Sequence, residues 1–249
     1  MNRKRWLIVL PVALIMVMFL GLGGFVIWAM DARPAGPAAL QAMESSQQVR
    51  VSEDGSLHFQ PRVGRPQTGL VFYPGGRVEP EAYAVLAHDI AREGYLVVIP
   101  RMPLNLAVLD RQAARRVMAN YPGVNTWLVG GHSLGGAMAA GYAGSQQSGV
   151  QGLILMASFP ADSNDLSESG LRVLSIYGTR DGLAMPDEVT GAAHLLPDHT
   201  QWVAISGGNH AGFGDYGTQP GDGTAALSQD AQWTQIVDAV VRFLSGFQR

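Results

Sequence analysis

One segment, residues 127–144, constrains the fold of this chain more than any other: WLVGGHSLGGAMAAGYAG. It begins as an apolar strand, ends as a helix of small residues, and places Ser133 at the turn between them. Gly131 and Gly135 flank this serine in a glycine-x-serine-x-glycine pattern. Between a strand and a helix, this pattern typically holds a serine on a strained turn with its hydroxyl exposed. We therefore interpret Ser133 as a candidate nucleophile.

The rest of the chain from residue 49 onward alternates short apolar runs with helical patterns. Buried strands are predicted for runs such as TGLVFYP, YLVVIP and GLILMA, and helices for segments such as EAYAVLAHDIAREG, AVLDRQAARRVMAN and DAQWTQIVDAVVRFLSG. A hairpin that turns at residues 54–55 is expected before them. Such alternation predicts an α/β fold over residues 49–249, with a mostly parallel sheet flanked by helices on both faces.

The first thirty residues carry a signal for a membrane. A basic cluster at residues 3–5 precedes an apolar run that holds no charge until Asp31. This run exceeds the ~20 residues that span a bilayer, whereas a cleaved signal peptide usually has an apolar core of about 7–15 residues. We predict a single transmembrane anchor in residues 1–30, with the basic cluster in the cytoplasm and the rest outside. The alternative is a protein secreted after signal cleavage, and residues 31–48 are predicted as a linker.

A serine hydroxyl becomes a good nucleophile only when a base takes its proton and a carboxylate orients that base. Asp181 follows the predicted strand RVLSIYG, and His210 follows the next strand, TQWVAIS. Both therefore fall at the sheet edge where open α/β sheets bind their ligands. Asp162 and Asp187 are alternatives for the acid. The other histidines are less suitable as the base. His132 lies in the turn itself, and His58 and His88 lie in other predicted elements. His194 and His199 lie in a segment that is expected to be exposed.

The loop PGGRVEPEAY follows the strand LVFY and is a candidate source of oxyanion donors. Its two glycines allow a backbone N–H to approach a reacting carbonyl. We choose Gly76, with Arg77 as the alternative, and the N–H of Leu134 as the second donor. The Arg77 side chain is a candidate for holding an anionic group of a substrate. The simpler expectation is that it pairs at the surface with Glu79 or Glu81.

The glycine-rich loop FGDYGTQPGDG after His210 offers further candidates. Phe213 could wall a substrate pocket, and the loop's aspartates, Asp215 and Asp222, could bind an ion. A loop closed by its own turns needs neither role, so no metal site is predicted.

Composition excludes several classes of site. The chain has no cysteine, which excludes disulfides, thiolate metal ligands and a cysteine nucleophile. Its formal net charge of -3 gives no reason to expect nucleic acid as a partner. Its 249 residues suffice for one domain with a substantial core.

These residues resemble the α/β-hydrolase superfamily over residues 49–249. The stretches YPGGRVEPEAY, GGHSLGGAMAA, YGTRDGL and GGNHAGFGDYG are similar to its fold-5-type bacterial serine hydrolases, many of which have an N-terminal membrane or signal segment. The chain order Ser133, Asp181, His210 is the order of that superfamily. Pro74 stands where relatives often have histidine, which leaves open whether the N–H of Gly76 or that of Arg77 points inward.

The resemblance implies a serine esterase that needs no cofactor and cleaves a small-molecule acyl ester through an acyl-enzyme. An acyltransferase or amidase that uses the same triad is the alternative, as is a non-catalytic binding module. Only SFPADSNDLSESGL separates two predicted strands where many relatives insert a helical lid. We therefore expect a minimal lid and an open site for small or extended soluble acyl substrates.

Overall fold

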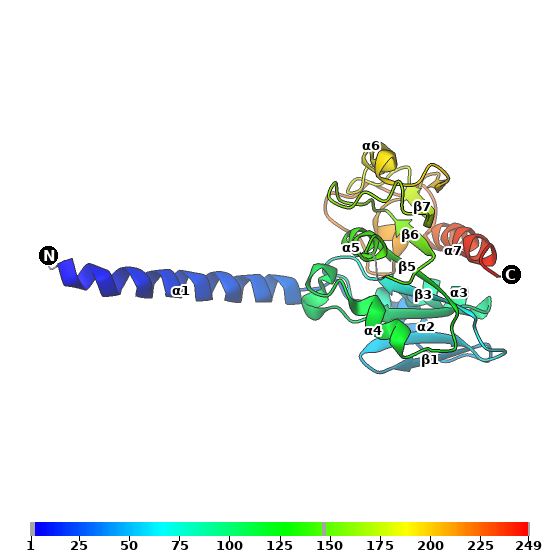
Figure 1. Cartoon of the computed structure of the whole chain (residues 1–249), viewed down its shortest axis with the longest axis horizontal. Helices are drawn as coiled ribbons and strands as arrows, with labels where there is room; N and C mark the ends of the chain where they lie inside the picture. Colours follow the sequence, from blue (N-terminus) through cyan, green and yellow to red (C-terminus); the bar gives the residue numbers. More distant parts are fainter. Residues whose placement is uncertain (1–2, 146–147, 249) are drawn as a thin grey trace.

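In the described part of the chain, eight strands form one sheet in the order β1-β2-β4-β3-β5-β6-β7-β8 (Figure 1). The computed structural model describes the backbone of residues 3–145 and 148–248, and within these ranges the side chains from residue 14 onward. The strands are β1 (Val49–Glu53), β2 (Ser56–Pro61), β3 (Thr68–Tyr73), β4 (Leu96–Pro100), β5 (Thr126–His132), β6 (Gly152–Met156), β7 (Arg172–Gly178) and β8 (Gln201–Ile205).

The predicted mostly parallel sheet is confirmed. β1 and β2 form the expected antiparallel hairpin, and β2 also runs antiparallel to β4. All remaining neighbours in the sheet are parallel. Parallel neighbours need crossover connections, and most of the helices lie in these connections. The helices after the first are α2 (Pro37–Ala42), α3 (Ala84–Arg92), α4 (Ala113–Ala119), α5 (Leu134–Ala143), α6 (Pro186–Gly191) and α7 (Gln229–Ser245).

Helices cover both faces of the sheet and divide the core into two clusters. Leu70 and Phe72 of β3 point into the cluster that contains side chains of α2, α3 and α7. Val71 and Tyr73 of the same strand point into the cluster that contains side chains of α4 and α5. Successive side chains of a strand alternate between its faces, so a strand covered on both sides is apolar throughout. This explains the uninterrupted apolar run of β3, whose residues are all buried.

The helix expected over AVLDRQAARRVMAN is shorter than predicted. Only a 3-10 turn, η3 (Ala107–Leu109), forms at its start, and α4 begins at Ala113. The buried hydroxyl of Tyr73 donates to the carbonyl of Arg111 and accepts the N–H of Ala114, both within 3.0 Å. These two bonds satisfy backbone groups at the helix start, which helical periodicity alone does not reveal.

Residues 31–48, predicted as a linker, pack on the domain instead. Arg33 forms an isolated parallel β-bridge with Val78. Pro37 then begins α2, whose Ala39 is completely buried in the core. Proline is favourable in the first turn of a helix, and Ala39 belongs to the core cluster that contains side chains of α3 and α7. An alanine-rich composition usually indicates a flexible linker. In residues 31–48 the alanines are instead the small residues of a packed segment.

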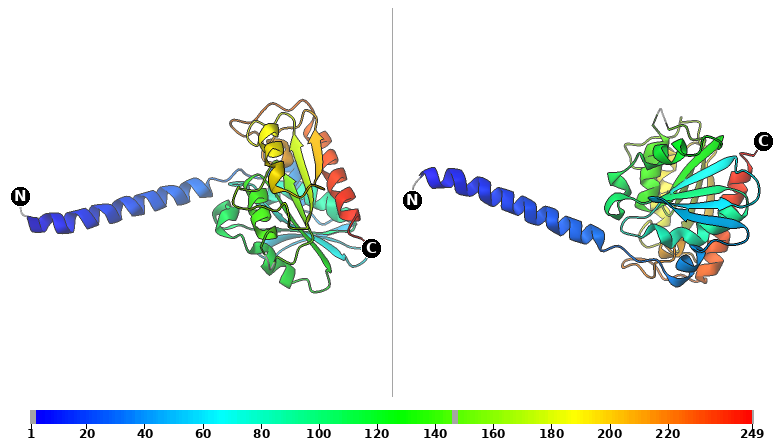
Figure 2. Two further views of the ribbon diagram at one scale, coloured as in Figure 1. Left: turned by 45° about the horizontal axis from the view of Figure 1, so that its top comes forward. Right: turned by 90° about the horizontal axis from the view of Figure 1, so that it is seen from below.

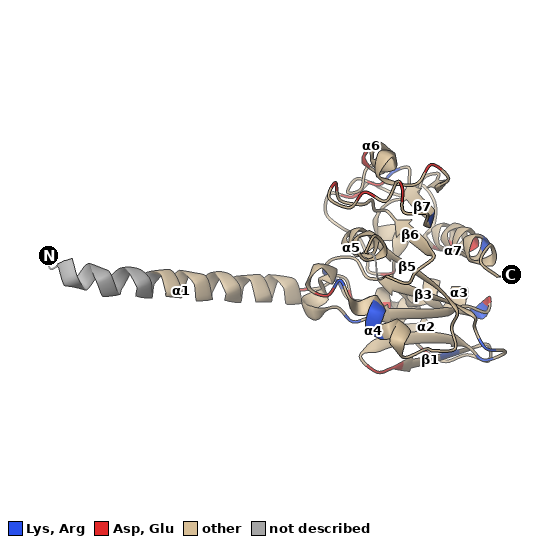
Figure 3. Cartoon of the chain, viewed as in Figure 1, with Lys and Arg blue, Asp and Glu red and all other residues tan. Residues whose placement is uncertain are grey.

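Helix α1 (Arg3–Met30) extends away from the sheet and its covering helices (Figure 2). Its described side chains include no charged residue (Figure 3), and most of the large apolar ones are exposed. Within the described part of the chain, no helix has the length and apolarity that are needed to cross a membrane. The side chains of residues 1–13, which belong to the predicted anchor, lie outside the described part.

Candidate active site

The turn between β5 and α5 holds Ser133 in the left-handed region, with φ of 52°. This conformation is uncommon for a residue with a side chain, and it occurs where surrounding structure holds it. The Ser133 N–H donates to the carbonyl of Met156 on the neighbouring strand, at 3.0 Å. A Cβ atom on Gly131 or Gly135 would lie within 2.6 Å of the carbonyl oxygen of Tyr73. The flanking glycines are therefore required for the strand and helix to approach each other.

Asp181 and His210 come together at the same edge of the sheet. Asp181 follows β7 and His210 follows β8, and Oδ2 of the carboxylate lies 2.8 Å from Nδ1 of the imidazole. Both side chains are almost completely buried. The second carboxylate oxygen of Asp181 accepts the N–H groups of Leu183 and Ala184, each at 2.8 Å. These three hydrogen bonds fix the orientation of the Asp181 carboxylate, and this carboxylate in turn orients the imidazole of His210.

The alternatives for acid and base lie elsewhere. Asp162 and Asp187 are both exposed. Among the other histidines, His58 contacts Asp54 and Tyr121, His194 and His199 each contact a backbone carbonyl, and His88 lies on α3. The hydrogen bond of Asp181 to His210 thus favours the pair that chain order predicts.

His132, the last residue of β5, is the centre of a buried ring cluster that sequence reasoning did not find. Its Nδ1 lies 2.9 Å from the hydroxyl of Tyr83, which also accepts the N–H of Gly75 at 2.9 Å. The ring of His210 lies 4.5 Å away, between centroids, and Phe213 stacks on His132 with an angle of 15° between the rings. Burial holds the pKa of His132 well below its usual range, so the ring is neutral. The signal in the sequence was the polar residue at the end of an otherwise apolar strand.

Phe213 and Asp222, in the loop after His210, make structural contacts. Phe213 is completely buried, so its ring packs against His132 and does not wall an open pocket. The carboxylate of Asp222 accepts the N–H groups of Gly182, His210 and Ala211, at 3.2, 3.1 and 2.8 Å. Asp222 thereby connects the loop of the acid to the loop of the base.

The loop after β3 leaves one N–H free for an oxyanion. The Gly75 N–H donates to Tyr83, and the Arg77 N–H donates to the carbonyl of Asn105 at 2.8 Å. Among the described residues, the N–H of Gly76 has no acceptor. A Cβ on Gly76 would lie 3.0 Å from the side chain of Leu134, whose own N–H begins α5 and has no helical partner. The geometry therefore favours Gly76 over Arg77 as the donor beside Leu134.

The Arg77 side chain has a partner that the sequence did not predict. Its guanidinium donates to the carboxylate of Asp31 at 2.9 Å and lies 4.6 Å from the ring centroid of Trp28. The expected surface pairing with Glu79 or Glu81 is wrong, because these carboxylates have other partners. Arg77 therefore connects its loop to the end of α1.

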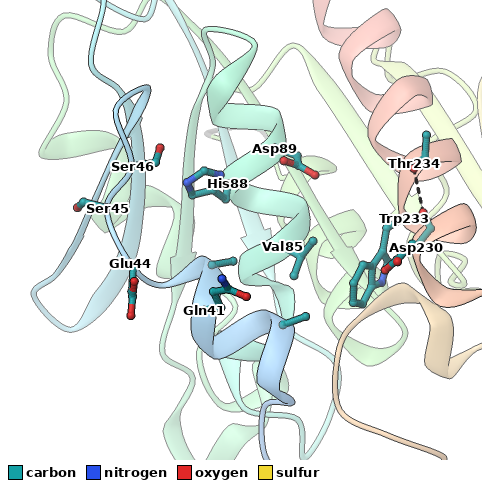
Figure 4. Close-up of a pocket in the computed structure, with 12 residues that line it drawn as sticks. Gln41, Glu44, Ser45, Ser46, Val85, His88, Asp89, Asp230, Trp233 and Thr234 are labelled. Carbon is teal, nitrogen blue, oxygen red and sulfur yellow. Dashed lines mark hydrogen bonds between the residues drawn. The ribbon is translucent and has the colours of Figure 1, made fainter.

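A groove of about 270 Å³ opens beside Ser133. Apolar side chains dominate its walls, among them Leu134, Phe159, Pro160 and Leu183. All of residues 157–171, between β6 and β7, are described, and they form turns without a helix. The segment between β6 and β7 is thus short and without a helix, as the sequence predicts. A larger groove of about 540 Å³ lies between α2, α3 and α7 (Figure 4), and neither Ser133, Asp181 nor His210 lines it.

Comparisons with known proteins agree with this fold. Solved structures with the same fold include TT1662 from Thermus thermophilus, with 14% identity and a TM-score of 0.59 over 80% of this chain and 99% of that one. Esterase 2 from Thermogutta terrifontis has 13% identity and a TM-score of 0.59, over 82% of this chain and 96% of its own. The esterase domain of a Rhodothermus marinus protein has 14% identity and a TM-score of 0.54, over 77% of this chain and 95% of its own.

The curated proteins include no significant match to the sequence. The alpha/beta hydrolase family matches residues 69–234, a segment that contains Ser133, Asp181 and His210 and spans most of the chain. The chain belongs to the alpha/beta hydrolase family.

Proposed function

We propose that this chain is a serine hydrolase that cleaves a carboxylic ester, with Ser133 as nucleophile, His210 as base and Asp181 orienting that base. One observation carries the proposal: the buried 2.8 Å hydrogen bond between Asp181 and His210. It lies at the sheet edge where Ser133 is held on a strained turn. Esterases among the solved structures of the same fold support it further.

In the proposed reaction, Oγ of Ser133 adds to the carbonyl carbon of the ester while its proton passes to Nε2 of His210. The N–H groups of Gly76 and Leu134 donate to the oxygen that becomes negatively charged. The C–O bond to the alcohol then breaks, and the alcohol leaves with the proton from His210. A water molecule, deprotonated by the same imidazole, cleaves the acyl-enzyme and restores the hydroxyl of Ser133.

The groove beside Ser133 favours a short acyl chain. Its volume of about 270 Å³ is close to the lower end of the roughly 300–1,000 Å³ that is usual for ligand pockets. Apolar walls suit the hydrocarbon part of an ester, and the absence of a helix over described residues 157–171 leaves the groove open. The first carbons of an acyl chain can pack against these walls, whereas the far end of a long chain would extend into water.

A series of p-nitrophenyl esters tests this function. We expect the purified protein to hydrolyse the acetate and butyrate faster than the laurate, because added methylenes gain no further burial. Turnover only with an added alcohol acceptor would identify an acyltransferase, and turnover only of an anilide would identify an amidase. A folded protein that hydrolyses none of these compounds and does not react with a fluorophosphonate would be a binding module.

We also propose that residues 1–30 anchor the protein in the cytoplasmic membrane, with the hydrolase domain outside. The exposed apolar side chains on α1 from Leu14 to Met30 support this proposal, because a large apolar surface in water is unfavourable. The basic cluster at residues 3–5 supports the orientation.

Cell fractionation tests the anchor. We expect full-length protein in the membrane fraction, with the hydrolase domain cleaved by protease added to spheroplasts, because the domain lies outside. A cytoplasmic protein serves as the control for intact spheroplasts. A shorter soluble protein that begins near Ala32 would show that residues 1–30 are a cleaved signal.

A further inference from the structure

Residues 31–39, here called the strap, lie between two loops of the proposed active site. The first is the oxyanion loop, residues 74–79, and the second is the histidine loop, residues 210–218. The strap precedes the segment that matches the alpha/beta hydrolase family, which begins at residue 69. Its contacts with the two loops are nonetheless numerous, and most of them use the backbone.

The strap holds the oxyanion loop next to the proposed donor Gly76. The N–H of Arg33 donates to the carbonyl of Arg77 at 2.7 Å, and the N–H of Glu79 donates to the carbonyl of Arg33 at 3.0 Å. Arg77 itself has φ of 56°, in the left-handed region that a residue with a side chain occupies only when its surroundings enforce it. The Arg33 backbone is one of the groups that enforce it.

The strap also holds the histidine loop. The N–H of Gly36 donates to the carbonyl of Asp215 at 2.6 Å, and the N–H of Ala39 donates to Oδ2 of the same residue at 2.9 Å. The guanidinium of Arg33 donates to the carbonyl of Thr218 at 3.1 Å. Asp215 is buried, and it lies two residues after Phe213, whose ring stacks on His132 beside His210.

We infer that the strap is a positioning element of the active site, which sets the oxyanion donor Gly76 and the base His210 at their working separation. Arg33 and Gly36 contact one loop each through their backbone N–H groups. Neither residue touches the reacting atoms, so their effect passes through Arg77 and Asp215. The inference rests on the proposed serine hydrolase function. It also explains why residues 31–39 are packed against the domain.

Substitution Gly36→Ala in the full-length protein tests the inference. The new Cβ would lie 2.2 Å from the carboxylate of Asp215, so either this carboxylate or the strap must shift. Either shift disturbs the hydrogen bond between Asp215 and the N–H of Ala39. Displacements of about 1 Å remote from the chemistry can cost about 100-fold in rate. We expect kcat to fall by about 10- to 100-fold with KM nearly unchanged, because the misplaced groups act mainly in the transition state. Gly123→Ala is the matched control, since no atom lies within 4 Å of its Cβ position.

Two readouts separate positioning from a merely structural role. The first is kcat per active site, counted by complete titration with a fluorophosphonate, so that unfolded protein does not contribute. The second is the affinity for a boronic acid, whose tetrahedral adduct with Ser133 resembles the transition state. We expect this affinity to weaken by the same factor as kcat. A lower melting temperature with wild-type kcat per titrated site and wild-type boronate affinity would overturn the inference.

A second pair of variants decides the question if Gly36→Ala fails to fold. Arg33→Pro removes the N–H that donates to Arg77, whereas Arg33→Ala retains it and loses only the contact with Thr218. We expect the proline variant to lose much more of kcat than the alanine variant. Equal kcat per titrated site in the two variants would overturn the inference. A wild-type protein that neither hydrolyses esters nor reacts with the fluorophosphonate would overturn the proposed function, and the inference with it.

Discussion

Alanine at Ser133 or at His210 should lower ester hydrolysis by about 10⁴- to 10⁶-fold, and the double variant should lose little more. The two side chains act as one unit, because the hydroxyl is a weak nucleophile until the imidazole takes its proton. Once either is gone, the other contributes little. Steady-state kinetics with p-nitrophenyl butyrate measures this loss.

Matched substitutions control for effects on folding. Ser163→Ala and His194→Ala change the same residue types at exposed positions and should retain wild-type turnover. Ser133→Ala should keep the fold, since it removes one hydroxyl from a partly exposed turn. If the losses of the two single variants multiply in the double variant, Ser133 and His210 act independently and the proposed mechanism is wrong.

The substitution Asp181→Asn should lower kcat by about 10⁴-fold while leaving the fold intact. An asparagine amide would donate to Nδ1 of His210, which places the remaining proton on Nε2, the atom that must accept the proton of Ser133. The carbonyl of the asparagine can still accept the N–H groups of Leu183 and Ala184, so the loop should keep its shape.

Two further variants show whether the acid is assigned correctly. Asp162→Asn and Asp187→Asn change exposed carboxylates and should leave kcat near the wild-type value. Near-normal turnover of Asp181→Asn, together with an inactive variant at one of the other two positions, would transfer the role of the acid to that residue. Circular dichroism of each variant checks that its fold is retained.

Much of the fold was predictable because it depends on local patterns. The apolar runs of β3 and β4 and the amphipathic pattern of α7 indicate elements directly. The glycines around Ser133 indicate the turn, because only they allow β5 and α5 to approach so closely. The pairing of Asp181 with His210 followed from the strand ends, which meet at one edge of a parallel sheet. Their catalytic role, like that of Ser133, stays a prediction.

The strap and the contacts of Arg77 were not predictable in this way. Ala39 and Asp215 are separated by 176 positions in the sequence, and Asp31 and Arg77 by 46. The strap is held mainly by backbone N–H groups, which every residue but proline possesses. The types of the side chains therefore do not indicate to which acceptor each N–H donates. The composition of residues 31–48 therefore indicated a flexible linker, because it does not reveal the backbone hydrogen bonds that hold this segment on the domain.

Mass spectrometry of the protein after reaction with a fluorophosphonate tests the mechanism most directly. The mechanism predicts one tag on the peptide that contains Ser133, no tag in Ser133→Ala, and strongly slowed labelling in His210→Ala. A tag on any other residue, or no labelling of the folded wild-type protein, would contradict it.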